Sequence, residues 1–431
     1  MTTLVVRPSP VSGTCTVPGN KSISHRALLL GATARGTTHV RGLGLGGDVA
    51  ATVACLKRYG IGIEASPDET TIDAPGIDSW VAPRSALDCA NSGTTMRTLA
   101  GLAARRSFET TLDGDASLRR RPMDRVAKPL TALGARVTTT GGRPPLRISG
   151  GDLHGADISL DVASAQVKTA VLFAGLGAHE TTTLTEPTVS RDHSERMLAA
   201  LGAPLVEETA ADGSHRVRIE AFDIPPFSTA VPGDVSSAAF LVAAALLTGE
   251  IRIDGVGLNP TRVRFLETAR QMDGNVTTEI QGDEMGEPIG TVAATRSALK
   301  AVTVDGSDPG IQDELPLVAL LATQADGETT VKAAGELRVK ESDRIDSVVR
   351  GLRSLGADIH ELVDGFVVRG PTRLRGATVD SFGDHRIAMM LAVAGLIADG
   401  ETVITNFECA AVSWPRFEQT LAALGADAVL R

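Results

Sequence analysis

The sequence predicts an α/β protein of two similar domains, each built from three copies of one structural repeat. The first observation is a phrase that occurs six times: an apolar helical run ends at a glycine and continues as an alternating strand. The second is its spacing of roughly 70–80 residues. The turn glycines are Gly60, Gly134, Gly202, Gly274, Gly356 and Gly425. The third is a length of 431 residues, too great for one ordinary core. Three repeats therefore fall in each domain.

A second phrase, a helix followed by a short polar turn and a strand, alternates with the first. LLLGATARGTTHVRG is its first copy and MLAVAGLIADGETVITNF its last. Each repeat thus holds two helices and several strands, more than a repeat of a helical solenoid contains. The Pro232-Gly233 pair marks a break, and a strand is expected near Thr2–Val6, ahead of the first repeat. We place an N-terminal domain at residues 18–231 and a C-terminal domain at residues 1–17 plus 232–431.

Composition excludes several classes of protein. No apolar run reaches the length of a membrane helix, and no basic start precedes an apolar stretch, so a cytoplasmic protein is expected. The four cysteines are scattered without a CxxC pair, which predicts neither a zinc site nor a disulfide framework. A net charge of -10 and an aromatic content of 3% argue against a nucleic-acid binder.

The stretch PGNKSISHRALLLGA, residues 18–32, predicts an anion-binding helix start. Lys21 stands just ahead of the helix, where unpaired backbone N–H groups and the helix dipole favour an anion. Ser22 and Arg26 are four residues apart and share one helical face. A capped surface helix with incidental basic residues is the alternative. A P-loop is excluded, because Asn20 separates Gly19 from Lys21.

LDCANSGTTMRTLAG, residues 87–101, repeats this plan. Asn91 and Thr94 lie in a polar turn where Gly93 permits close approach of a ligand, and Arg97 follows on the same face. In LRRRPMDRVAKPL, residues 118–130, four arginines precede a helix. Arg119, Arg120, Arg121 and Arg125 form either a solvated face or an anion site.

Two further helix starts in the first half carry polar groups. Ser164, Gln166 and Lys168 stand at the front of an apolar helix, and Ser190, Arg191 and His193 precede another. The two serines are either N-caps or ligand contacts, and His193 is expected to be structural or a hydrogen-bonding neighbour.

The second half supplies acids. Asp313 and Glu314 precede a buried helix. An acid at this position is either a cap favoured by the helix dipole or a base that faces a cleft. The i,i+3 and i,i+4 spacings in ELRVKESDRIDSVV predict one helical face carrying Lys340, Glu341 and Arg344, which as a surface network would contribute little. A third group precedes an almost wholly apolar helix: Asp384, His385 and Arg386.

Positively charged helix starts together with a few carboxylates favour more than one small polyanion as ligand. Bringing two dianions to about 5 Å would cost roughly 13 kcal/mol at an effective dielectric of 20. Several Lys and Arg side chains would offset that repulsion where no metal ligands are visible.

The motifs resemble those of the 5-enolpyruvylshikimate-3-phosphate synthase family over essentially the whole chain. The matching blocks, in the family's order, are PGNKS-x-S-x-RALLLGA, NSGTTMR, RPM-x-R, SAQVK, VPGD-x-SSAAF, DELPL-x-ALLA, RVKESDR and FGDHR-x-AMM. The resemblance, closest to the bacterial group with SAQVK and RPMxR, implies two domains of three βαβαββ units, each an inside-out α/β barrel. It implies transfer of the enolpyruvyl group of phosphoenolpyruvate to the 5-hydroxyl of shikimate 3-phosphate, in the shikimate pathway, without cofactor or metal, by a monomer.

The resemblance also implies site residues. Those expected to be catalytic are Lys21, Asp313, Lys340 and Glu341. The expected shikimate 3-phosphate contacts are Lys21, Ser22, Arg26, Ser164, Ala165, Gln166, Ser190, Asp313 and Lys340. The expected phosphoenolpyruvate contacts are Lys21, Gly93, Arg121, Gln166, Arg344 and Arg386. Supporting positions are Asn91, Thr94, Arg97, Arg191, His193, Asp384 and His385.

The chain departs from the family pattern at a few positions. Val412 and Ser413 stand near a lysine of some members, which leaves one phosphoenolpyruvate contact open. Thr98 replaces Pro or Leu of many relatives, and we hypothesise that it weakens the sensitivity to glyphosate, the family's inhibitor. Two alternatives remain: the sister enzyme acting on UDP-N-acetylglucosamine, whose loop cysteine is missing from residues 114–121, and a non-catalytic repeat scaffold.

Overall fold

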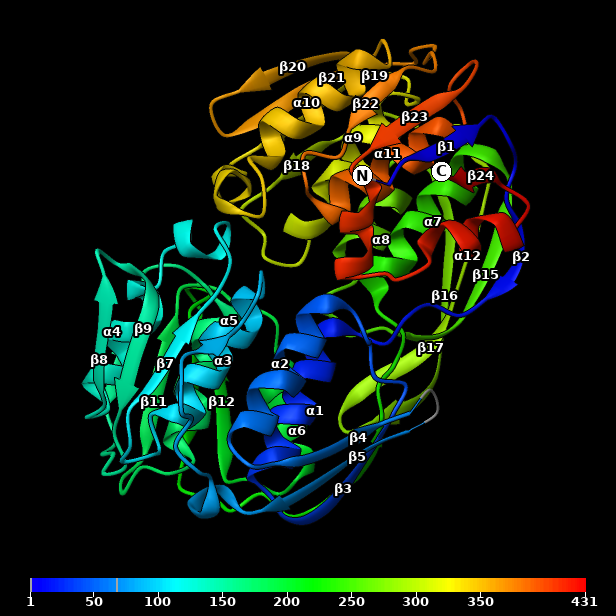
Figure 1. Ribbon diagram of the computed structural model, residues 1–431. Helices are drawn as coiled ribbons and strands as arrows, with labels where there is room; N and C mark the ends of the chain where they lie inside the picture. Colours follow the sequence, from blue (N-terminus) through cyan, green and yellow to red (C-terminus); the bar gives the residue numbers. More distant parts are fainter. Residues whose placement is uncertain (1, 67–68) are drawn as a thin grey trace. The chain divides into compact units, whose positions relative to one another are not determined.

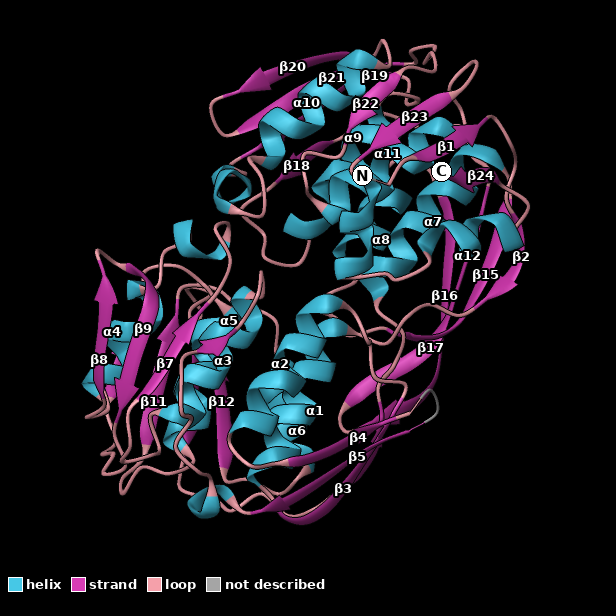
Figure 2. Cartoon of the chain, viewed as in Figure 1, coloured by secondary structure: helices cyan, strands magenta, loops and turns pink. Residues whose placement is uncertain are grey.

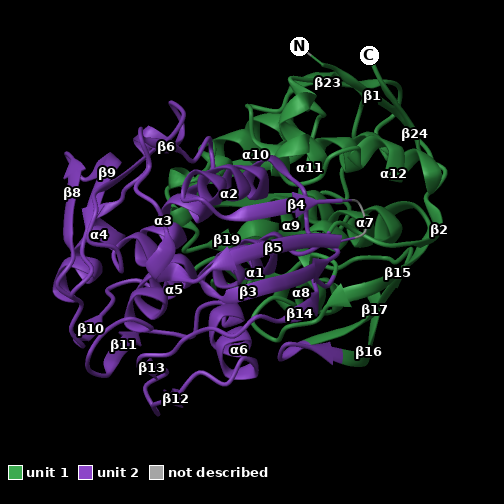
Figure 3. Cartoon of the chain, turned by 60° about the horizontal axis from the view of Figure 1, so that its bottom comes forward, with its two compact units in different colours: residues 1–18, 233–282, 288–431 green, residues 19–232, 283–287 purple. Residues whose placement is uncertain are grey.

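The computed structural model describes residues 2–66 and 69–431, and the chain divides into two compact units (Figure 3). Unit 1 comprises residues 1–18, 233–282 and 288–431, and unit 2 comprises residues 19–232 and 283–287. The chain therefore passes from one unit to the other after residues 18, 232, 282 and 287.

Within the described residues, unit 2 contains three four-stranded sheets of the same topology (Figure 1). In each sheet the first strand runs parallel to the second, and the third and fourth strands are antiparallel to their neighbours. The orders are β14-β3-β5-β4, β6-β7-β9-β8 and β10-β11-β13-β12. The bounds are β3 Arg35–Arg41, β4 Gly62–Ala65, β5 Glu69–Pro75, β6 Leu87–Asp88, β7 Thr110–Asp113, β8 Arg136–Thr140, β9 Arg143–Ser149, β10 Asp157–Ser159, β11 Thr182–Glu186, β12 Leu205–Thr209, β13 His215–Ile219 and β14 Ser228–Ala230.

Unit 1 has, over the part of the chain that the structure covers, three more four-stranded sheets. Their orders are β22-β23-β1-β24, β16-β17-β15-β2 and β18-β19-β21-β20. The bounds are β1 Leu4–Arg7, β2 Ser12–Cys15, β15 Glu250–Gly257, β16 Asn275–Glu284, β17 Glu287–Thr295, β18 Thr303–Asp305, β19 Gly327–Lys332, β20 Asp358–Leu362, β21 Gly365–Gly370, β22 Thr378–Asp380, β23 Thr402–Thr405 and β24 Asp427–Leu430. The N-terminal strand β1 lies between β23 and β24, so the start of the chain completes a sheet of unit 1.

The helices that form the core of each unit are apolar on almost every side. In unit 1 all residues of α9 and α11 are buried, as are most of α7. A helix that is apolar all round belongs inside a core, and Figure 2 shows helices flanked by strands within each unit. The core helices are α1 Lys21–Thr33, α3 Gly93–Ala103, α5 Ala165–Gly175, α7 Val235–Thr248, α9 Leu315–Ala322 and α11 His385–Gly395.

A second set of helices has one buried and one exposed face. These are α2 Gly47–Arg58, α4 Asp124–Ala132, α6 His193–Ala200, α8 Arg264–Gln271, α10 Arg344–Ser354 and α12 Phe417–Ala423. No helix in the described ranges is long and apolar enough to cross a lipid bilayer. Six helix pairs with six sheets agree with the predicted repeat, and the sequence-derived fold class is confirmed by the solved structures reported below.

Each amphipathic helix ends with one residue in the left-handed conformation, and five of these residues are the expected glycines. Gly60 is an example: it has φ of 89°, and the N–H groups of Gly60 and Ile61 donate to carbonyls of the last helical turn. In the fourth copy Asp273 takes this position with φ of 61°. Gly274 follows it, and a Cβ there would lie 2.6 Å from the Ala269 carbonyl oxygen. The glycine of this copy is therefore required by close backbone approach and not by its φ.

Candidate active-site residues of the two units

Lys21 begins helix α1 in unit 2 and forms an ion pair across to helix α2. Asn20 caps the helix by accepting from the Ile23 N–H at 3.0 Å, which fixes the direction in which Lys21 leaves the first turn. Its Nζ lies 3.0 Å from Oδ2 of Asp48, in the first turn of α2. The Lys21 side chain keeps 23% of its exposure, so its ammonium remains accessible to an anion. Sequence analysis missed Asp48, because an acid in a first helical turn is also an ordinary dipole contact.

Arg26 lies one turn further along α1 and is buried. Its Nε donates to Ser194 Oγ at 2.7 Å, and its Nη2 donates to Thr169 Oγ1 at 2.6 Å. Its Nη1 donates to the backbone carbonyl of Ser22 at 2.9 Å, so the two residues do share a face. Burial lowers the pKa of Arg26 to about 10, which still leaves it charged at neutral pH. Hydroxyls on α5 and α6 therefore hold a desolvated guanidinium at the start of α1.

The start of helix α3 carries a chain of polar contacts to α5. Arg97 Nη1 donates to Gln166 Oε1 at 2.5 Å, and Gln166 Nε2 donates to Thr94 Oγ1 at 2.9 Å. Gly93 is the first residue of α3, and a Cβ on it would lie 3.0 Å from Arg97 Nη1 and 3.2 Å from Arg121 Nη1. Two guanidinium groups thus flank a glycine backbone at a helix N-terminus, an arrangement suited to a carboxylate or phosphate.

The four arginines of residues 119–125 have different surroundings. Arg121 is buried, and its Nη2 donates to Asn91 Oδ1 at 2.6 Å. Arg119 and Arg120 are exposed, and Arg119 pairs with Asp113 at 2.5 Å. Arg125 is half-buried. The stretch is therefore no single cationic cluster, and only Arg121 joins the group around Gly93.

The remaining predicted positions of unit 2 lie at the starts of α5 and α6. Ser164 caps α5 by accepting from the Val167 N–H, with Ala165 as the first helical residue. Ser190 is buried, and both its N–H and its hydroxyl donate to Glu186 Oε1. Half-buried Arg191 follows it. His193 Nδ1 lies 2.7 Å from Oε1 of Glu287, with both side chains 1% exposed, so the histidine is held by a hydrogen-bonding partner as expected.

In unit 1, Arg344 holds three carboxylates. Its Nε donates to Asp384 Oδ2 at 2.8 Å, its Nη1 to Asp313 Oδ1 at 3.2 Å and its Nη2 to Glu341 Oε2 at 2.6 Å. Burial alone would lower the pKa of Arg344, but the three carboxylates outweigh burial and raise it. Burial correspondingly acts to raise the pKa of Asp384, and Arg344 reverses that effect, so the net shift is downward.

The expected helical face carrying Lys340, Glu341 and Arg344 is wrong. Helix α10 begins only at Arg344, and Asp343 caps it. Lys340 and Glu341 therefore precede the helix, in a bend of the chain. The Glu341–Arg344 pair forms nonetheless, at 2.6 Å. Sequence spacing identified this contact for a reason that does not hold, because a turn can also bring residues i and i+3 together.

Asp313 is a carboxylate at which three cations of unit 1 meet. Besides Arg344, its Oδ2 lies 3.4 Å from Arg386 Nη2, and its Oδ1 lies 4.0 Å from Lys340 Nζ. It belongs to a 3-10 turn, Gln312–Glu314, directly before α9. Asp384 caps α11 by accepting from the Arg386 N–H, and His385 is buried behind it. The unit therefore brings its predicted charged residues into one cluster.

A second carboxylate of this turn belongs to a network that sequence analysis missed. Glu314 Oε1 accepts from the hydroxyl of Ser236, which in turn accepts from Arg262 Nη2. Arg386 Nη1 lies 3.3 Å from the same Glu314 oxygen. Ser236 belongs to the VPGD-x-SSAAF block, but Arg262 stood in no motif. Only long-range packing reveals it, since 26 residues separate the serine and the arginine.

The chain matches a family model over residues 5–421, described as EPSP synthase (3-phosphoshikimate 1-carboxyvinyltransferase). It is 47% identical over 421 residues to the 3-phosphoshikimate 1-carboxyvinyltransferase of Synechococcus sp. (strain RCC307), covering 96% of each chain. The solved EPSP synthase of Acinetobacter baumannii superposes with a TM-score of 0.88 at 38% identity over the full length of both chains.

A more distant structure, the enolpyruvyl transferase NikO from Streptomyces tendae, matches with a TM-score of 0.80 at 20% identity over 100% of this chain and 99% of that one. It supports the fold alone. The agreement of the family model, of a close relative and of a solved structure over nearly every residue establishes that the chain belongs to the EPSP synthase family.

Proposed function

We propose that this chain is a 3-phosphoshikimate 1-carboxyvinyltransferase, which transfers the enolpyruvyl group of phosphoenolpyruvate to the 5-hydroxyl of shikimate 3-phosphate and releases phosphate. The observation that carries the proposal is the cluster around Asp313, where a carboxylate is placed among Lys340, Arg344 and Arg386. Such a cluster can hold a carboxylate ionised for proton transfer and can stabilise negative charge that develops on a substrate.

The addition step requires two proton transfers. The 5-hydroxyl oxygen bonds to C2 of phosphoenolpyruvate while its proton passes to Asp313, and C3 of the methylene group receives a proton from Glu341. The product is a tetrahedral ketal phosphate. Lys340, 4.0 Å from the Asp313 carboxylate, favours its ionised form as the reaction begins.

Elimination reverses the proton movement at C3. The bond between C2 and the phosphate oxygen breaks, and the departing phosphate takes up the proton that Asp313 received from the 5-hydroxyl. A proton returns from the C3 methyl group to Glu341, and the C2–C3 double bond forms again. Arg344 Nη2, 2.6 Å from Glu341 Oε2, keeps that carboxylate oriented in both steps. Positioning of the two substrates and preorganised cations therefore stabilise the transition states of both steps.

Unit 2 supplies groups for binding the two substrates. We assign Ser22, Arg26, Ser164, Ala165 and Ser190 to shikimate 3-phosphate, with Lys21 and Gln166 contacting both substrates. We assign Gly93 and Arg121 to phosphoenolpyruvate, together with Arg344 and Arg386 of unit 1. Supporting this assignment, Arg97 and Arg121 both lie within about one hydrogen-bond length of the space that a Gly93 side chain would occupy.

Phosphate release from phosphoenolpyruvate tests the proposal directly. Release should depend on shikimate 3-phosphate, and UDP-N-acetylglucosamine should not replace it. Asp313→Asn, matched against Asp308→Asn at a half-buried position paired with Arg264, should lower kcat by about 10²–10⁴-fold, the usual contribution of general acid–base catalysis. Release that proceeds equally with the nucleotide sugar, or no release at all, would reject the proposal. Light scattering would test the predicted monomer.

A further inference from the structure

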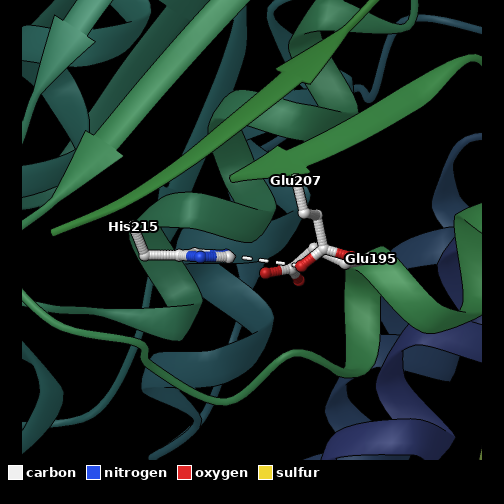
Figure 4. A group of neighbouring side chains, drawn as sticks. All are labelled: Glu195, Glu207 and His215. Carbon is white, nitrogen blue, oxygen red and sulfur yellow. Dashed lines mark ion pairs between the residues drawn. The ribbon is translucent and has the colours of Figure 1, made fainter. Parts of the chain in front are cut away.

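A second group of ionisable side chains in unit 2 has no role in the reaction described above. It consists of Glu195 on α6, Glu207 on β12 and His215 on β13, and one ligand-type atom from each lies within 4.8 Å of the others. Among the described residues it is the one group of three His, Cys, Asp or Glu side chains gathered this closely. Figure 4 shows the two carboxylates side by side with the imidazole pointing at them.

The register of the β12–β13 hairpin places two of these residues on one face. Glu207 is paired with Val217 and Thr209 with His215, so these four side chains point the same way from the sheet. Val217 and His215 are buried on that face. The Glu207 side chain keeps 38% of its exposure, so the cluster is open to solvent at this residue.

The imidazole of His215 is oriented as a ligand would be. Thr209 Oγ1 lies 3.2 Å from Nδ1 of His215. This contact occupies Nδ1 and leaves Nε2 facing the carboxylates. Nε2 lies 3.3 Å from Glu207 Oε2, yet it is buried and has no partner in hydrogen-bonding geometry. Two ligands of a tetrahedral zinc ion, each at about 2.1 Å, are separated by about 3.4 Å. The separation of the two atoms fits a shared ion.

The carboxylate of Glu195 is completely buried and incompletely compensated. Lys168 Nζ lies 2.6 Å from Oε1 of Glu195 and 2.6 Å from Oε1 of Glu186, so one ammonium serves two buried acids. Oε2 of Glu195 has no hydrogen-bond partner. This buried carboxylate oxygen faces an imidazole and a second carboxylate. A cation bound between the three groups would stabilise it.

We propose that Glu195, Glu207 and His215 bind a divalent transition-metal ion of the zinc class. Three protein ligands from imidazole and carboxylate match the donor preference of Zn²⁺ and leave a fourth position for water at the exposed side of Glu207. Mg²⁺ and Ca²⁺ are disfavoured by the imidazole ligand. The ion would tie helix α6 to the β12–β13 hairpin, so its role is structural and separate from the enolpyruvyl transfer.

Metal binding can be measured without turnover. The full chain would be dialysed against a chelator and then titrated with Zn²⁺, and with Co²⁺ as a spectroscopic probe whose visible absorption reports the coordination geometry. We expect one equivalent per chain, no competition by excess Mg²⁺, and a higher melting temperature when Zn²⁺ is present. Glu207→Gln and His215→Gln should each raise the dissociation constant for Zn²⁺ at least tenfold, about the smallest effect expected for the loss of a ligand.

Glu208→Gln is the matched control, because Glu208 neighbours Glu207 on the opposite face of β12 and pairs with Arg218 at 2.9 Å. It should bind Zn²⁺ as the unmodified chain does. Circular dichroism checks that Glu207→Gln, a change at a partly exposed position, leaves the fold intact. The proposal is overturned if the dialysed chain takes up no stoichiometric metal, or if uptake persists unchanged in Glu207→Gln and His215→Gln.

Discussion

At the scale of single residues, Arg344 is a buried cation of unit 1 that donates hydrogen bonds to three carboxylates. It is 1% exposed and pairs with Asp384, which is fully buried. Arg344→Met retains the unbranched stem but removes the guanidinium from three carboxylates, and breaking a buried pair in this way costs about 3–5 kcal/mol. Urea unfolding should therefore show a large loss in the free energy of unfolding, together with loss of turnover.

A double-mutant cycle isolates the pair. Asp384→Asn in the Arg344→Met background should recover part of the lost stability, because it removes the buried negative charge left behind. Arg350→Met is the control on the same helix, since Arg350 pairs with Asp346 at an exposed position and should cost less than about 1 kcal/mol. Equal losses in Arg344→Met and Arg350→Met would contradict the assigned importance of Arg344.

Gly93 is the residue at which the smallest change should affect substrate binding most selectively. The methyl group of Gly93→Ala would press on the Arg97 and Arg121 guanidinium groups at 3.0 and 3.2 Å. Loosening one charge-assisted hydrogen bond to phosphoenolpyruvate should raise the KM for phosphoenolpyruvate about tenfold. The KM for shikimate 3-phosphate should change far less.

The control for this change is Gly335→Ala, whose added methyl group would meet no atom within 4 Å. Steady-state kinetics with each substrate varied in turn gives both constants. If Gly93→Ala leaves the KM for phosphoenolpyruvate unchanged, or raises both constants alike, Gly93 does not lie at the phosphoenolpyruvate site.

At the scale of elements, helices α1, α2 and α3 are joined by a buried chain of hydrogen bonds. His25 Nδ1 lies 2.7 Å from Thr52 Oγ1, and Thr52 Oγ1 lies 2.8 Å from Thr95 Oγ1. Burial, reinforced by the neighbouring Lys21 and Arg26, lowers the pKa of His25 to about 3, while Asp48 opposes the shift. The histidine is neutral in the folded chain and contributes to the contacts among the three helices.

This shift predicts a pH-dependent stability. Below its ordinary pKa of about 6.5, His25 binds a proton in the unfolded chain but not in the folded chain, so the stability is complete above pH 6.5 and is lost as the pH falls towards 3. Between pH 8 and pH 5 the loss from this group is about 2 kcal/mol. Urea unfolding at both pH values should show that His25→Gln, which stays neutral, loses about that much less than the unmodified chain. Identical pH slopes would mean that His25 binds its proton equally well in the folded and the unfolded chain, which would contradict the lowered pKa.

The elements themselves were largely predictable from the sequence, because their signals are local. A glycine at the left-handed end of a helix, or a serine at its cap, acts within a few residues, and the six repeats showed each signal several times. The sequence did not predict in the same way which charged or polar side chains contact one another. Lys168 pairs with Glu186 and Glu195 on other elements of its own repeat, and Glu314 accepts from Ser236 of another repeat, 78 residues away. Tertiary packing decides both contacts.

At the scale of the whole molecule, the tip of the β16–β17 hairpin belongs to unit 2 although the rest of the hairpin belongs to unit 1. Within unit 2, Glu287 of this tip forms the buried contact with His193, Arg196 Nη1 donates to the carbonyl of Gly286 at 2.8 Å, and the Ala230 N–H donates to Glu284 Oε1 at 2.8 Å. Unit 2 therefore depends on residues supplied from a distant part of the sequence.

The chain contains two tryptophans, and each unit has one of them. Trp80 of unit 2 and Trp414 of unit 1 are both buried, at 3% and 2% exposure, so their fluorescence should change on unfolding. Trp414→Phe leaves Trp80 as the reporter of unit 2, and Trp80→Phe leaves Trp414 as the reporter of unit 1. In each of these two single-tryptophan variants, the effect of a substitution in the hairpin tip on the unfolding of one unit can be followed by fluorescence.

Glu287→Gln keeps the size of the side chain and removes its charge from the contact with His193. A hydrogen bond to a charged group is worth about 1.5–3 kcal/mol, and with a urea m-value of about 2–3 kcal/mol/M the Trp80 midpoint should fall by about 0.5–1.5 M. The Trp414 midpoint should fall by less, because the lost contact lies in unit 2. Glu279→Gln, at an exposed position of β16 outside the tip, should move neither midpoint. Equal shifts of both reporters would show that the tip is not a stabilising part of unit 2 alone, since the two units would then unfold as one.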